Sequence, residues 1–401
     1  MRGFCPMEYE TICSFETLYA AYLRARRGKR KKLRTQRFEA NALESLYEIA
    51  EQLKDGSYRP GAFEHFKVYE PKERDIEAPA FEDKVVLHAV TDNGLYDAIT
   101  SGFIRNNCSN QKGKGTADAV IRLKQCFVRY YARYKTTSGW VLKCDIRHFF
   151  ASIDHNVAKA KLLAVCEKHG VDPRIYELLC RYIDNSPQGL PLGYQTSQLL
   201  ALLMLDALDH AVTETLGFPL YVRGMDDFVV IAYNKQDLQT LLREIRRLTG
   251  SIGLELNEKT AIFPLENGVD FLGFHTYFTK TGGVVQKLRR SSLKRMKDRI
   301  KRWRHEYAEG RISAEKIRDS FQAWDAHAAF GDTWGIRSKL AKEVEGIIGI
   351  KVPIHRKLNS TRAQRKARRE RQQRFIEKKR RRAFDCETQH RTRNPDTPPW
   401  E

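Results

Sequence analysis

Two adjacent carboxylates, Asp226 and Asp227, interrupt an apolar, β-prone segment that runs from residue 220 to residue 232. This pattern predicts a β-hairpin with paired carboxylates at its tip. A third carboxylate, Asp145, directly follows the apolar run Trp140 to Cys144. Carboxylates at neighbouring strand ends suit hard divalent cations, and two such cations can clamp an in-line phosphoryl displacement. An adjacent Asp pair alone would also fit an ordinary surface turn, where Asp is favoured.

The elements that must position these residues form a mixed pattern of helices and short strands. Strands are expected at 58–80, 140–144, 220–232, 253–263 and 269–278. Helices are expected at 8–54, 81–105, 116–134, 154–166, 172–182, 198–216, 236–248, 288–309 and 313–345. The helix at 288–309 is the clearest, because apolar residues at 3-4-3-4 spacing lie opposite a basic face. The pattern therefore predicts an α/β (α+β) chain.

The positive charge of the chain is concentrated in two segments. The net charge is +21, and 41% of the 401 residues are hydrophobic, which excludes a globally disordered chain. Residues 24–37 hold 9 Lys/Arg and no acid, and residues 351–382 hold 15 Lys/Arg and 2 acids. Such dense patches attract polyanions, most often nucleic acid. Two solvated charge runs are the alternative.

Cysteine use and hydropathy exclude several other classes of protein. The eight cysteines include no CxxC pair, so a zinc ribbon is not expected. Several of them lie in apolar runs, which fits a reducing cytosol better than a disulfide framework. No apolar stretch reaches the length of a membrane span or a signal core. We therefore expect a cytoplasmic protein with no membrane partner.

Two segments carry a resemblance to a known family. Residues 143–155 and 223–228 resemble two catalytic motifs of the reverse transcriptases, and 81 residues separate Asp145 from Asp226. The resemblance extends over about residues 58–345. It implies a right-hand polymerase with fingers at 58–138, a palm with part of the fingers at 139–278 and a helical thumb at 279–346. A basic helical segment at 1–57 would precede these domains, and a basic tail at 347–401, helical or disordered, would follow them.

The same resemblance implies roles for the three carboxylates. Asp145 and Asp226, with the backbone of Ile146, would hold two Mg²⁺ ions, for which Mn²⁺ is a possible substitute, and Asp227 would assist. One ion would activate a primer 3′-OH and the other would hold the triphosphate and leaving group. Phe150, five residues after Asp145, corresponds to an aromatic that blocks a ribose 2′-OH and so selects dNTPs. A core phenylalanine beside Phe149 is the alternative.

Two positions depart from the common pattern of the family. Gly224 replaces an aromatic residue before Met225, which removes a side chain expected near the primer terminus. In the loop 192–198, Leu192 stands where most members have Gln, and Gln198 stands where they have Pro. This version of the loop is similar to that of diversity-generating retroelements, where the missing Gln is linked to errors opposite adenine. Gln can hydrogen-bond an incoming nucleotide and Leu cannot, a difference of about 0.5–1.5 kcal/mol.

Other positions carry weaker predictions. Lys72 and Arg74 would grip the triphosphate, Gly193 would help to place the dNTP, and Lys259 would protonate pyrophosphate. A charged turn at 70–74 and a solvated Lys259 are the alternatives. Met225, Gln198 and the segment Phe271, Leu272 and Gly273 would contact primer or template, although 271–274 also fits a core strand. The residues expected to bind nucleic acid are Arg24, Arg26, Arg27, Lys29, Arg30, Lys31, Lys32, Lys294, Arg295, Arg299, Arg302, Arg365, Arg368 and Arg369.

The partners implied by this interpretation are a structured noncoding or template RNA, the cDNA product, and an accessory protein or second polymerase subunit. Folded RNA is recognised by its shape and backbone, which suits the two basic segments. The biological setting stays open between mutagenic copying in a diversity-generating retroelement, cDNA synthesis in antiphage defence, and a maturase-like role. A non-catalytic RNA-binding scaffold on a polymerase fold is the rival from a different class.

Overall fold

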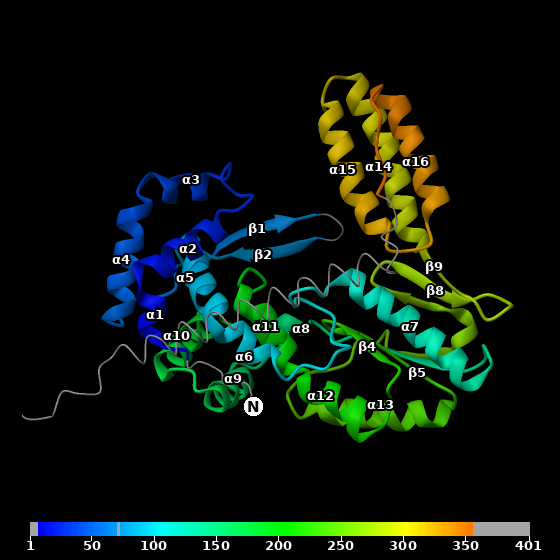
Figure 1. Cartoon of the computed structure of the whole chain (residues 1–401), viewed down its shortest axis with the longest axis horizontal. Coiled ribbons are helices and arrows are strands. Elements are labelled where there is room, and N and C mark those ends of the chain that lie inside the picture. The colour runs from blue at the N-terminus through cyan, green and yellow to red at the C-terminus, as the bar shows by residue number, and fades with distance from the viewer. Residues whose placement is uncertain (1–6, 70–72, 356–401) are drawn as a thin grey trace, which may run out of the picture. The chain divides into compact units, whose positions relative to one another are not determined.

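The computed structural model describes residues 7–69 and 73–355. The chain divides into two compact units, residues 1–296 and residues 297–401 (Figure 1). The boundary falls inside one helix, α14 (Arg290–Ala308), so its first two turns belong to the first unit.

The first unit begins with a group of short helices: α1 (Tyr9–Cys13), α2 (Phe15–Ala25), α3 (Leu33–Ala40) and α4 (Ala42–Lys54). They pack against one another and against α5 (Phe81–Val90). The buried residues Leu18, Leu46, Ile49 and Leu53 form the apolar faces of α2 and α4, and the hydroxyl of Ser14 caps α2 by accepting the Thr17 N–H. The antiparallel hairpin of β1 (Glu64–Val68) and β2 (Arg74–Ala78) connects α4 to α5.

A four-stranded antiparallel sheet forms the centre of the first unit. It contains β3 (Trp140–Cys144), β4 (Tyr221–Gly224), β5 (Asp227–Ala232) and β6 (Ala261–Pro264), in the order β4-β5-β3-β6. One face carries Leu142 and Val230, in the core shared with α13 (Lys235–Gly250). The other carries Val141 and Val229, in the core shared with α7 (Thr116–Tyr134). Both faces are covered, which explains why these strands are almost continuously apolar; Figure 1 shows α7 and α13 on opposite sides of β4 and β5.

The remaining helices of the first unit lie between these strands in the sequence. They are a π-helical turn at Thr91–Leu95, α6 (Tyr96–Thr100), α8 (Phe149–Ser152), α9 (His155–His169), α10 (Pro173–Asp184), α11 (Gln195–Met204), α12 (Asp206–His210), a second π-helical turn at Ala211–Thr215, and a 3₁₀ turn at Leu265–Asn267. The single helix predicted at 198–216 is therefore three consecutive pieces. Leu205, with φ −99° and ψ 6°, separates α11 from α12.

A second antiparallel sheet joins β7 (Val269–Phe271), β8 (Phe274–Phe278) and β9 (Val284–Leu288). Sequence patterning missed β9, because Val284, Val285 and Leu288 directly precede a strong helical pattern. The strand predicted across 253–263 is mostly wrong as well. Within that range only 261–263 belongs to β6, and Leu256 forms an isolated bridge to Ile146.

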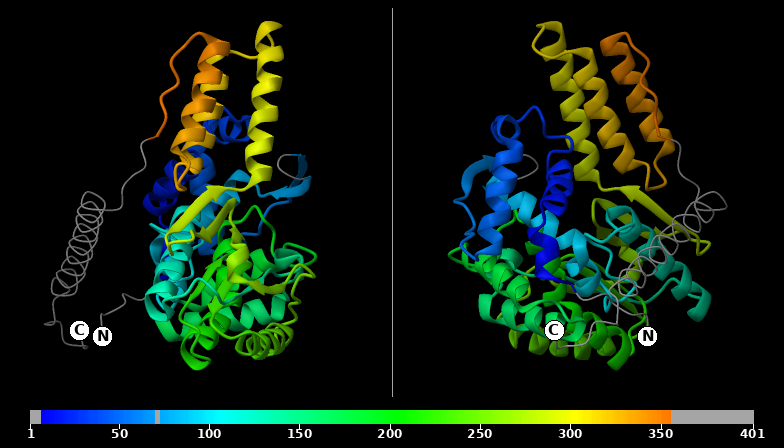
Figure 2. Two further views of the ribbon diagram at one scale, coloured as in Figure 1. Left: turned by 90° about the vertical axis from the view of Figure 1, so that its right-hand side faces the viewer. Right: turned by 60° about the vertical axis from the view of Figure 1, so that its left-hand side comes forward.

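The second unit is a small helical bundle that consists of the later turns of α14, α15 (Ala314–Ala328) and α16 (Trp334–Ile348) (Figure 2). Its core contains Ile300, Trp303, Ile317, Phe321, Leu340 and Val344. A buried ion pair joins Asp325 of α15 to Arg337 of α16 at 2.7 Å. His355 adds a backbone and a ring hydrogen bond to the same carboxylate, which ties the segment after α16 back to the bundle.

The six cysteines between residues 13 and 180 are free thiols, and five of them are buried. Within residues 7–69 and 73–355, no helix is both long enough and apolar enough to cross a lipid bilayer.

Candidate active site and nucleic-acid surfaces

The β4–β5 hairpin places Asp226 and Asp227 at one end of the central sheet. Gly224 and Asp227 form its last residue pair, which leaves Met225 and Asp226 as a two-residue loop. Met225 has φ +68° and Asp226 does not have positive φ, which is the sign pattern of a type II′ turn. Glycine is the usual residue at the first loop position. Met225 at this position therefore needs support from the surrounding structure.

Arg223 provides that support from inside the protein. Its guanidinium is completely buried and donates to the Met225 carbonyl at 2.8 Å and to the Leu202 carbonyl at 3.3 Å. It also forms a bidentate ion pair with the buried Asp209, at 2.7 and 2.6 Å. The Tyr221 hydroxyl donates to the same carboxylate at 2.6 Å. The hairpin tip is thus fixed by a fully buried charge pair, which is strongly destabilising to break.

Asp145 lies beside this hairpin tip. The β3–β5 register pairs Cys144 with Phe228, so Asp145, the residue after β3, comes level with Asp227. Beyond Cys144 the backbone bonds on its other side, with the Asn257 N–H donating to the Asp145 carbonyl at 2.7 Å and the Arg147 N–H donating to the Glu255 carbonyl at 2.9 Å. The three carboxylates that the sequence singles out therefore lie at the same end of neighbouring strands.

The charges at this end of the sheet are not balanced. Burial raises the pKa of the Asp227 carboxyl to about 6; Lys143 opposes this rise, and the neighbouring charges of Asp145 and Asp226 add to it. Lys143 Nζ lies 3.4 Å from Asp227 Oδ2. Asp227 Oδ1 is buried and has no hydrogen-bond partner among the described residues. An additional cation would relieve both the repulsion and the unpaired oxygen.

The donor chemistry fits a hard divalent cation, because all three side chains offer carboxylate oxygens. In the described part of the chain, however, no three His, Cys, Asp or Glu side chains are arranged as a ready metal-binding group. The carboxylates are neighbours rather than a closed ligand set. Side-chain rotation would have to bring them together around an ion.

Phe150 lies on α8, shortly after Asp145. Its ring meets Phe149 edge-on, with 5.6 Å between the ring centroids. Phe149 is 3% exposed and belongs to the core, whereas Phe150 is only half-buried. The Phe150 carbonyl accepts the Leu190 N–H at 2.8 Å, which ties α8 to the loop before α11. Phe150 therefore packs against the core and also leaves part of its ring exposed.

Within that loop, Gly193 and Leu192 have different surroundings. A Cβ added at Gly193 would overlap the Glu77 carbonyl oxygen of β2, so glycine is needed here for close packing of two backbones. Leu192 is 40% exposed. Gln198, on the first turn of α11, accepts a hydrogen bond from Asn110 at 2.6 Å.

The β7–β8 hairpin contacts the β4–β5 hairpin. Phe271 pairs with Phe274, and the loop residues Leu272 and Gly273 have φ +46° and +90°, as in a type I′ turn. A Cβ built on Gly224 would lie 2.9 Å from Leu272 Cδ1. Leu272 therefore occupies the space into which a side chain at residue 224 would extend.

The other residues predicted to contact the dNTP lie in a turn, at the start of a strand, or outside the described residues. Lys259 is exposed, in a turn where its N–H donates to the Asn257 side chain at 3.0 Å. Arg74 begins β2, with its backbone opposite Val68. Lys72 lies outside the described residues, as do Arg365, Arg368 and Arg369 of the tail.

The basic N-terminal segment is partly neutralised within the chain. Arg24 pairs with Asp92 at 2.5 Å, and Arg26 and Arg30 pair with Glu39 at 2.9 and 3.0 Å. Within residues 24–37, five exposed cations have no acidic partner among the described residues: Arg27, Lys29, Lys31, Lys32 and Arg37. On α14, Lys294 and Arg295 are exposed, Arg299 is half-buried, and Arg302 approaches Glu306 at 3.8 Å.

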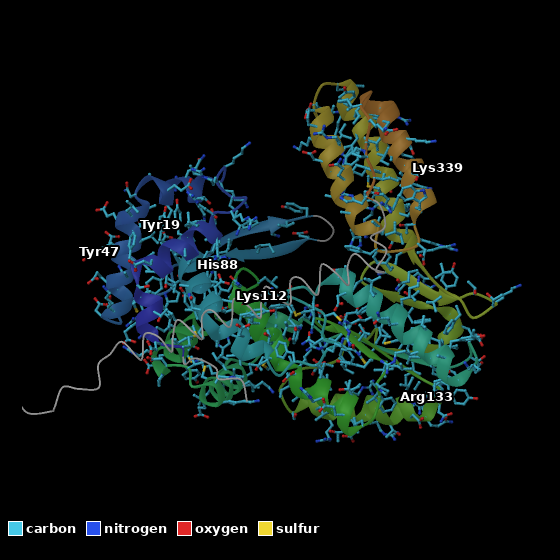
Figure 3. All side chains as sticks on the ribbon, in the orientation of Figure 1. Tyr19, Tyr47, His88, Lys112, Arg133 and Lys339 are labelled. Carbon is cyan, nitrogen blue, oxygen red and sulfur yellow. The ribbon has the colours of Figure 1, made fainter. Side chains whose placement is uncertain are left out.

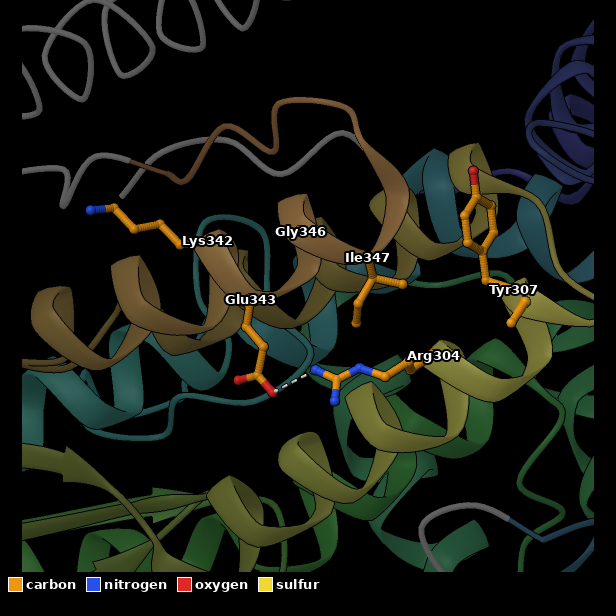
Figure 4. Close-up of a pocket in the computed structure, with 7 residues that line it drawn as sticks. Arg304, Tyr307, Lys342, Glu343, Gly346 and Ile347 are labelled. Carbon is orange, nitrogen blue, oxygen red and sulfur yellow. Dashed lines mark ion pairs between the residues drawn. The ribbon is translucent and has the colours of Figure 1, made fainter.

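Two features of the structure lie outside the residues that the sequence singled out. Arg223 was missed, although an arginine inside an apolar strand pattern is a signal of a buried ion pair. In the second unit, an open cavity of about 490 Å³ lies between α14 and α16 (Figure 4). Its one acid, Glu343, faces Arg304 at 3.8 Å, and Lys342 adds a second cation to the lining.

Comparison with known proteins gives one family match. The family model described as "Reverse transcriptase (RNA-dependent DNA polymerase)" matches residues 72–276, half of the chain. The matched segment contains the whole central sheet and all three carboxylates. Among curated proteins, no sequence matches the chain at a significant level.

Solved structures of yeast telomerases have a distantly similar fold. Apo telomerase from Candida tropicalis aligns with a TM-score of 0.45 and 14% identity, over 73% of this chain and 60% of that one. Candida albicans telomerase in complex with a fragment of telomeric RNA aligns with a TM-score of 0.44 and 10% identity, over 76% and 68%. A truncated Candida tropicalis telomerase aligns with 0.42 and 13%, over 58% of each chain. This chain spans less than two thirds of the Candida tropicalis structures.

Proposed function

The chain belongs to the reverse transcriptase family, and from this premise we propose that it is an active RNA-directed DNA polymerase with Asp145, Asp226 and Asp227 as its catalytic centre. The observation that carries the proposal is that these three residues lie at the same end of the neighbouring strands β4, β5 and β3. The raised pKa of Asp227 and its unpaired Oδ1 support it.

Each carboxylate has a distinct part in the proposed reaction. Asp145 and Asp226, helped by the Ile146 backbone, would hold the divalent ions, which supply charge stabilisation to an in-line displacement when bound. Asp227 would set the charge of the site, because it is partly neutralised by Lys143. Arg223 would keep the Met225–Asp226 turn in place through its bond to the Met225 carbonyl.

We further propose that the dNTP and primer residues surround this centre. Phe150 would exclude a ribose 2′-OH with its exposed side, Leu192 and Gly193 would line the nucleotide, and Lys72, Arg74 and Lys259 would contact its phosphates. Met225, Gln198 and the Phe271–Gly273 turn would contact primer or template, and Leu272 would take the place of the aromatic that Gly224 lacks.

The proposed substrate is a structured noncoding RNA, copied into cDNA with Mg²⁺ or Mn²⁺. The exposed cations Arg27, Lys29, Lys31 and Lys32, the basic face of α14 and the basic tail would hold it. The loop with Leu192 favours a bacterial diversity-generating or antiphage defence enzyme, working with an accessory protein or a second polymerase subunit.

One observation favours a second candidate, an RNA-binding scaffold without polymerase activity. The described residues contain no ready metal-binding group. If the carboxylates cannot close around an ion, the basic surfaces would still bind RNA.

A primer-extension assay separates the two candidates. Wild type, Asp226→Ala and the control Asp319→Ala would be given oligo(dT)-primed poly(rA), dTTP and either Mg²⁺ or Mn²⁺. Asp319 is an exposed acid on α15 and is not one of the proposed site residues, so its loss removes the same charge without changing them. We expect extension by wild type and control and a loss of at least about 1,000-fold in Asp226→Ala. Equal, background-level extension by all three proteins, together with intact RNA binding, would favour the scaffold.

A further inference from the structure

Three tyrosine rings follow one another from the core to the surface at the end of the central sheet where β3 begins and β5 ends. Tyr130 is completely buried on α7, Tyr134 is half-buried at the end of that helix, and Tyr233, which follows β5, is 52% exposed. The ring centroids of Tyr130 and Tyr134 lie 4.9 Å apart. Those of Tyr134 and Tyr233 lie 5.2 Å apart, with 20° between the planes. The outermost ring is therefore stacked on one side and accessible to solvent.

This tyrosine stack is already ordered in the free protein. The Tyr130 hydroxyl donates to the Ser138 carbonyl at 2.5 Å, which closes the turn after α7 against the innermost ring. Trp140 pairs with Ala232 in the sheet, so the chain is fixed at the residue before Tyr233. A surface that is ordered before binding loses little conformational entropy when a ligand binds. The stack therefore suits a ligand with a flat aromatic face.

Basic side chains surround the exposed ring. Arg133, Lys135 and Lys235 are exposed and have no acidic partner among the described residues. The Arg133 guanidinium lies 5.3 Å from the Tyr134 ring centroid, and Lys235 Nζ lies 4.8 Å from the Trp140 ring centroid. Figure 3 labels Arg133 at the end of α7. Aromatic rings interleaved with cations are the combination with which proteins bind single-stranded nucleic acid.

The acids of this region are engaged by neutral groups. Asp237, on the first turn of α13, accepts a hydrogen bond from the Asn234 side chain at 3.2 Å. Glu266 accepts one from the Ser138 hydroxyl at 2.6 Å. Neither acid forms an ion pair within the described part of the chain. The three cations around the stack therefore stay available to the phosphates of a polyanion.

The tyrosine stack is separate from the proposed catalytic centre. Trp140 begins β3 and Asp145 follows its last residue, so the strand holds the two about 16 Å apart. None of the residues that the proposed function assigns to primer, template or dNTP belongs to the stack or to the cations around it. The two sites lie at opposite ends of the same sheet.

We propose that a base of single-stranded RNA stacks on Tyr233, while Arg133, Lys135 and Lys235 attract the flanking phosphates. Stacking on tyrosine tolerates any base, because every base has a π-face, so the site holds the strand without reading its sequence. The inference rests on the proposed function only in taking RNA as the bound strand. It assigns to this end of the sheet a segment of that RNA which is not being copied.

Binding can be measured without catalysis. The full chain would be titrated against fluorescein-labelled oligo(rU), with no divalent ion and no dNTP. Tyr233→Ala should weaken binding about tenfold, and Tyr233→Phe, which keeps the ring, by less than about twofold. The control is Tyr47→Ala, because Tyr47 is 62% exposed on α4 and does not belong to the stack. Lys235→Gln should lower the slope of log K against log salt by about 0.7, whereas Lys168→Gln, at an exposed lysine of α9, should leave it unchanged.

Photo-crosslinking of the wild type tests the same site without a variant. Oligo(rU) that carries 5-iodouridine should crosslink to the peptides that contain Tyr134 or Tyr233, and not to the peptide that contains Tyr47. Mass spectrometry identifies the crosslinked peptides. A crosslink with iodinated oligo(dU) and not with oligo(rU) would assign the surface to the cDNA product and overturn the assignment to RNA.

Two further results would overturn the proposal. One is an affinity of Tyr233→Ala within about twofold of that of Tyr47→Ala, together with no crosslink at Tyr134 or Tyr233. The other is a loss of affinity in Lys235→Gln but not in Tyr233→Ala, because attraction by charge alone does not need the stack. Neither measurement depends on primer extension, so failure of the site and failure of the proposed function are separable.

Discussion

Replacing Gly224 by tyrosine should disrupt the contact between the β4–β5 and β7–β8 hairpins. An added Cβ would lie 2.9 Å from Leu272 Cδ1 and 3.4 Å from Leu272 Cδ2 and Phe271 Cζ. A single Cβ can displace the end of the leucine side chain, so Gly224→Ala should lower the free energy of unfolding by about 1 kcal/mol. A tyrosine ring must displace the whole side chain, and we expect a loss of about 3 kcal/mol.

Leu272→Gly should rescue Gly224→Tyr. Leu272 has φ +46°, a left-handed conformation that costs a non-glycine residue about 1–2 kcal/mol. Alone, Leu272→Gly relieves this strain but loses a half-buried side chain and loosens the unfolded chain by about 0.4–1 kcal/mol, so its net effect should be small. In the Gly224→Tyr background it also makes space for the ring. The double-mutant cycle should therefore give a coupling energy of about 2 kcal/mol.

Hydrogen exchange followed by mass spectrometry is the suitable assay, because peptides from β4 and β5 report the opening of this sheet and not of the second unit. Gly102→Tyr is the control, since a Cβ at Gly102 has no neighbour within 4 Å. Two results would refute the idea that the tyrosine ring and the Leu272 side chain compete for one space. One is additive effects of the two substitutions, and the other is a Gly224→Tyr protein whose β4 and β5 amides exchange as slowly as in wild type. Primer extension should fall in Gly224→Tyr and recover in the double variant.

Four further variants test the site. Between about pH 4 and 6 the folded protein binds more protons at Asp227 than the unfolded chain does, because the pKa is raised to about 6; stability should therefore fall as the pH rises through this range. Asp227→Asn should remove that fall in urea titrations and raise the free energy of unfolding by up to about 3 kcal/mol at pH 7.5, while primer extension drops. Arg223→Lys should lower stability by about 2 kcal/mol and reduce kcat for extension with little change in RNA affinity; unchanged kcat would remove its role at the turn. Phe150→Ala should raise rNTP incorporation relative to dNTP by about 10- to 100-fold. Unaltered sugar selection would exclude Phe150 as the residue that blocks the ribose 2′-OH. Leu192→Gln should lower misincorporation opposite adenine by about 2- to 10-fold, measured by sequencing the cDNA. An unchanged error spectrum would show that Leu192 does not cause these errors.

The central strands and the carboxylate hairpin could be predicted from sequence because their determinants are local. Apolar runs such as Val141–Cys144 and Phe228–Ala232 specify buried strands, and Asp is favoured in the turn between them. The amphipathic helix α14 was also predictable, since Met296, Ile300 and Trp303 recur at helical spacing and are all buried. The proximity of Asp145 followed from placing two strands in one sheet.

Tertiary contacts determine the features of the structure that the sequence pattern did not predict. Arg223 finds Asp209 only because α12 docks beneath β4, and no local rule pairs residues 14 positions apart. The strand β9 depends on β8 as its partner, and its sequence otherwise reads as the approach to α14. Likewise, the ion pairs of Arg24, Arg26 and Arg30 required the positions of Asp92 and Glu39. These pairs reduce the set of cations left for a nucleic acid.

The unusual positions of this chain differ in whether the surrounding structure has adapted to them. Gly224 is matched by Leu272, which fills its space. Restoring a side chain at residue 224 therefore requires a second change. Leu192 is 40% exposed, and nothing comparable restrains its replacement. In the proposed function, a substitution at residue 192 would consequently alter nucleotide selection alone, whereas a substitution at residue 224 would act first on the packing of the two hairpins and only through it on the primer.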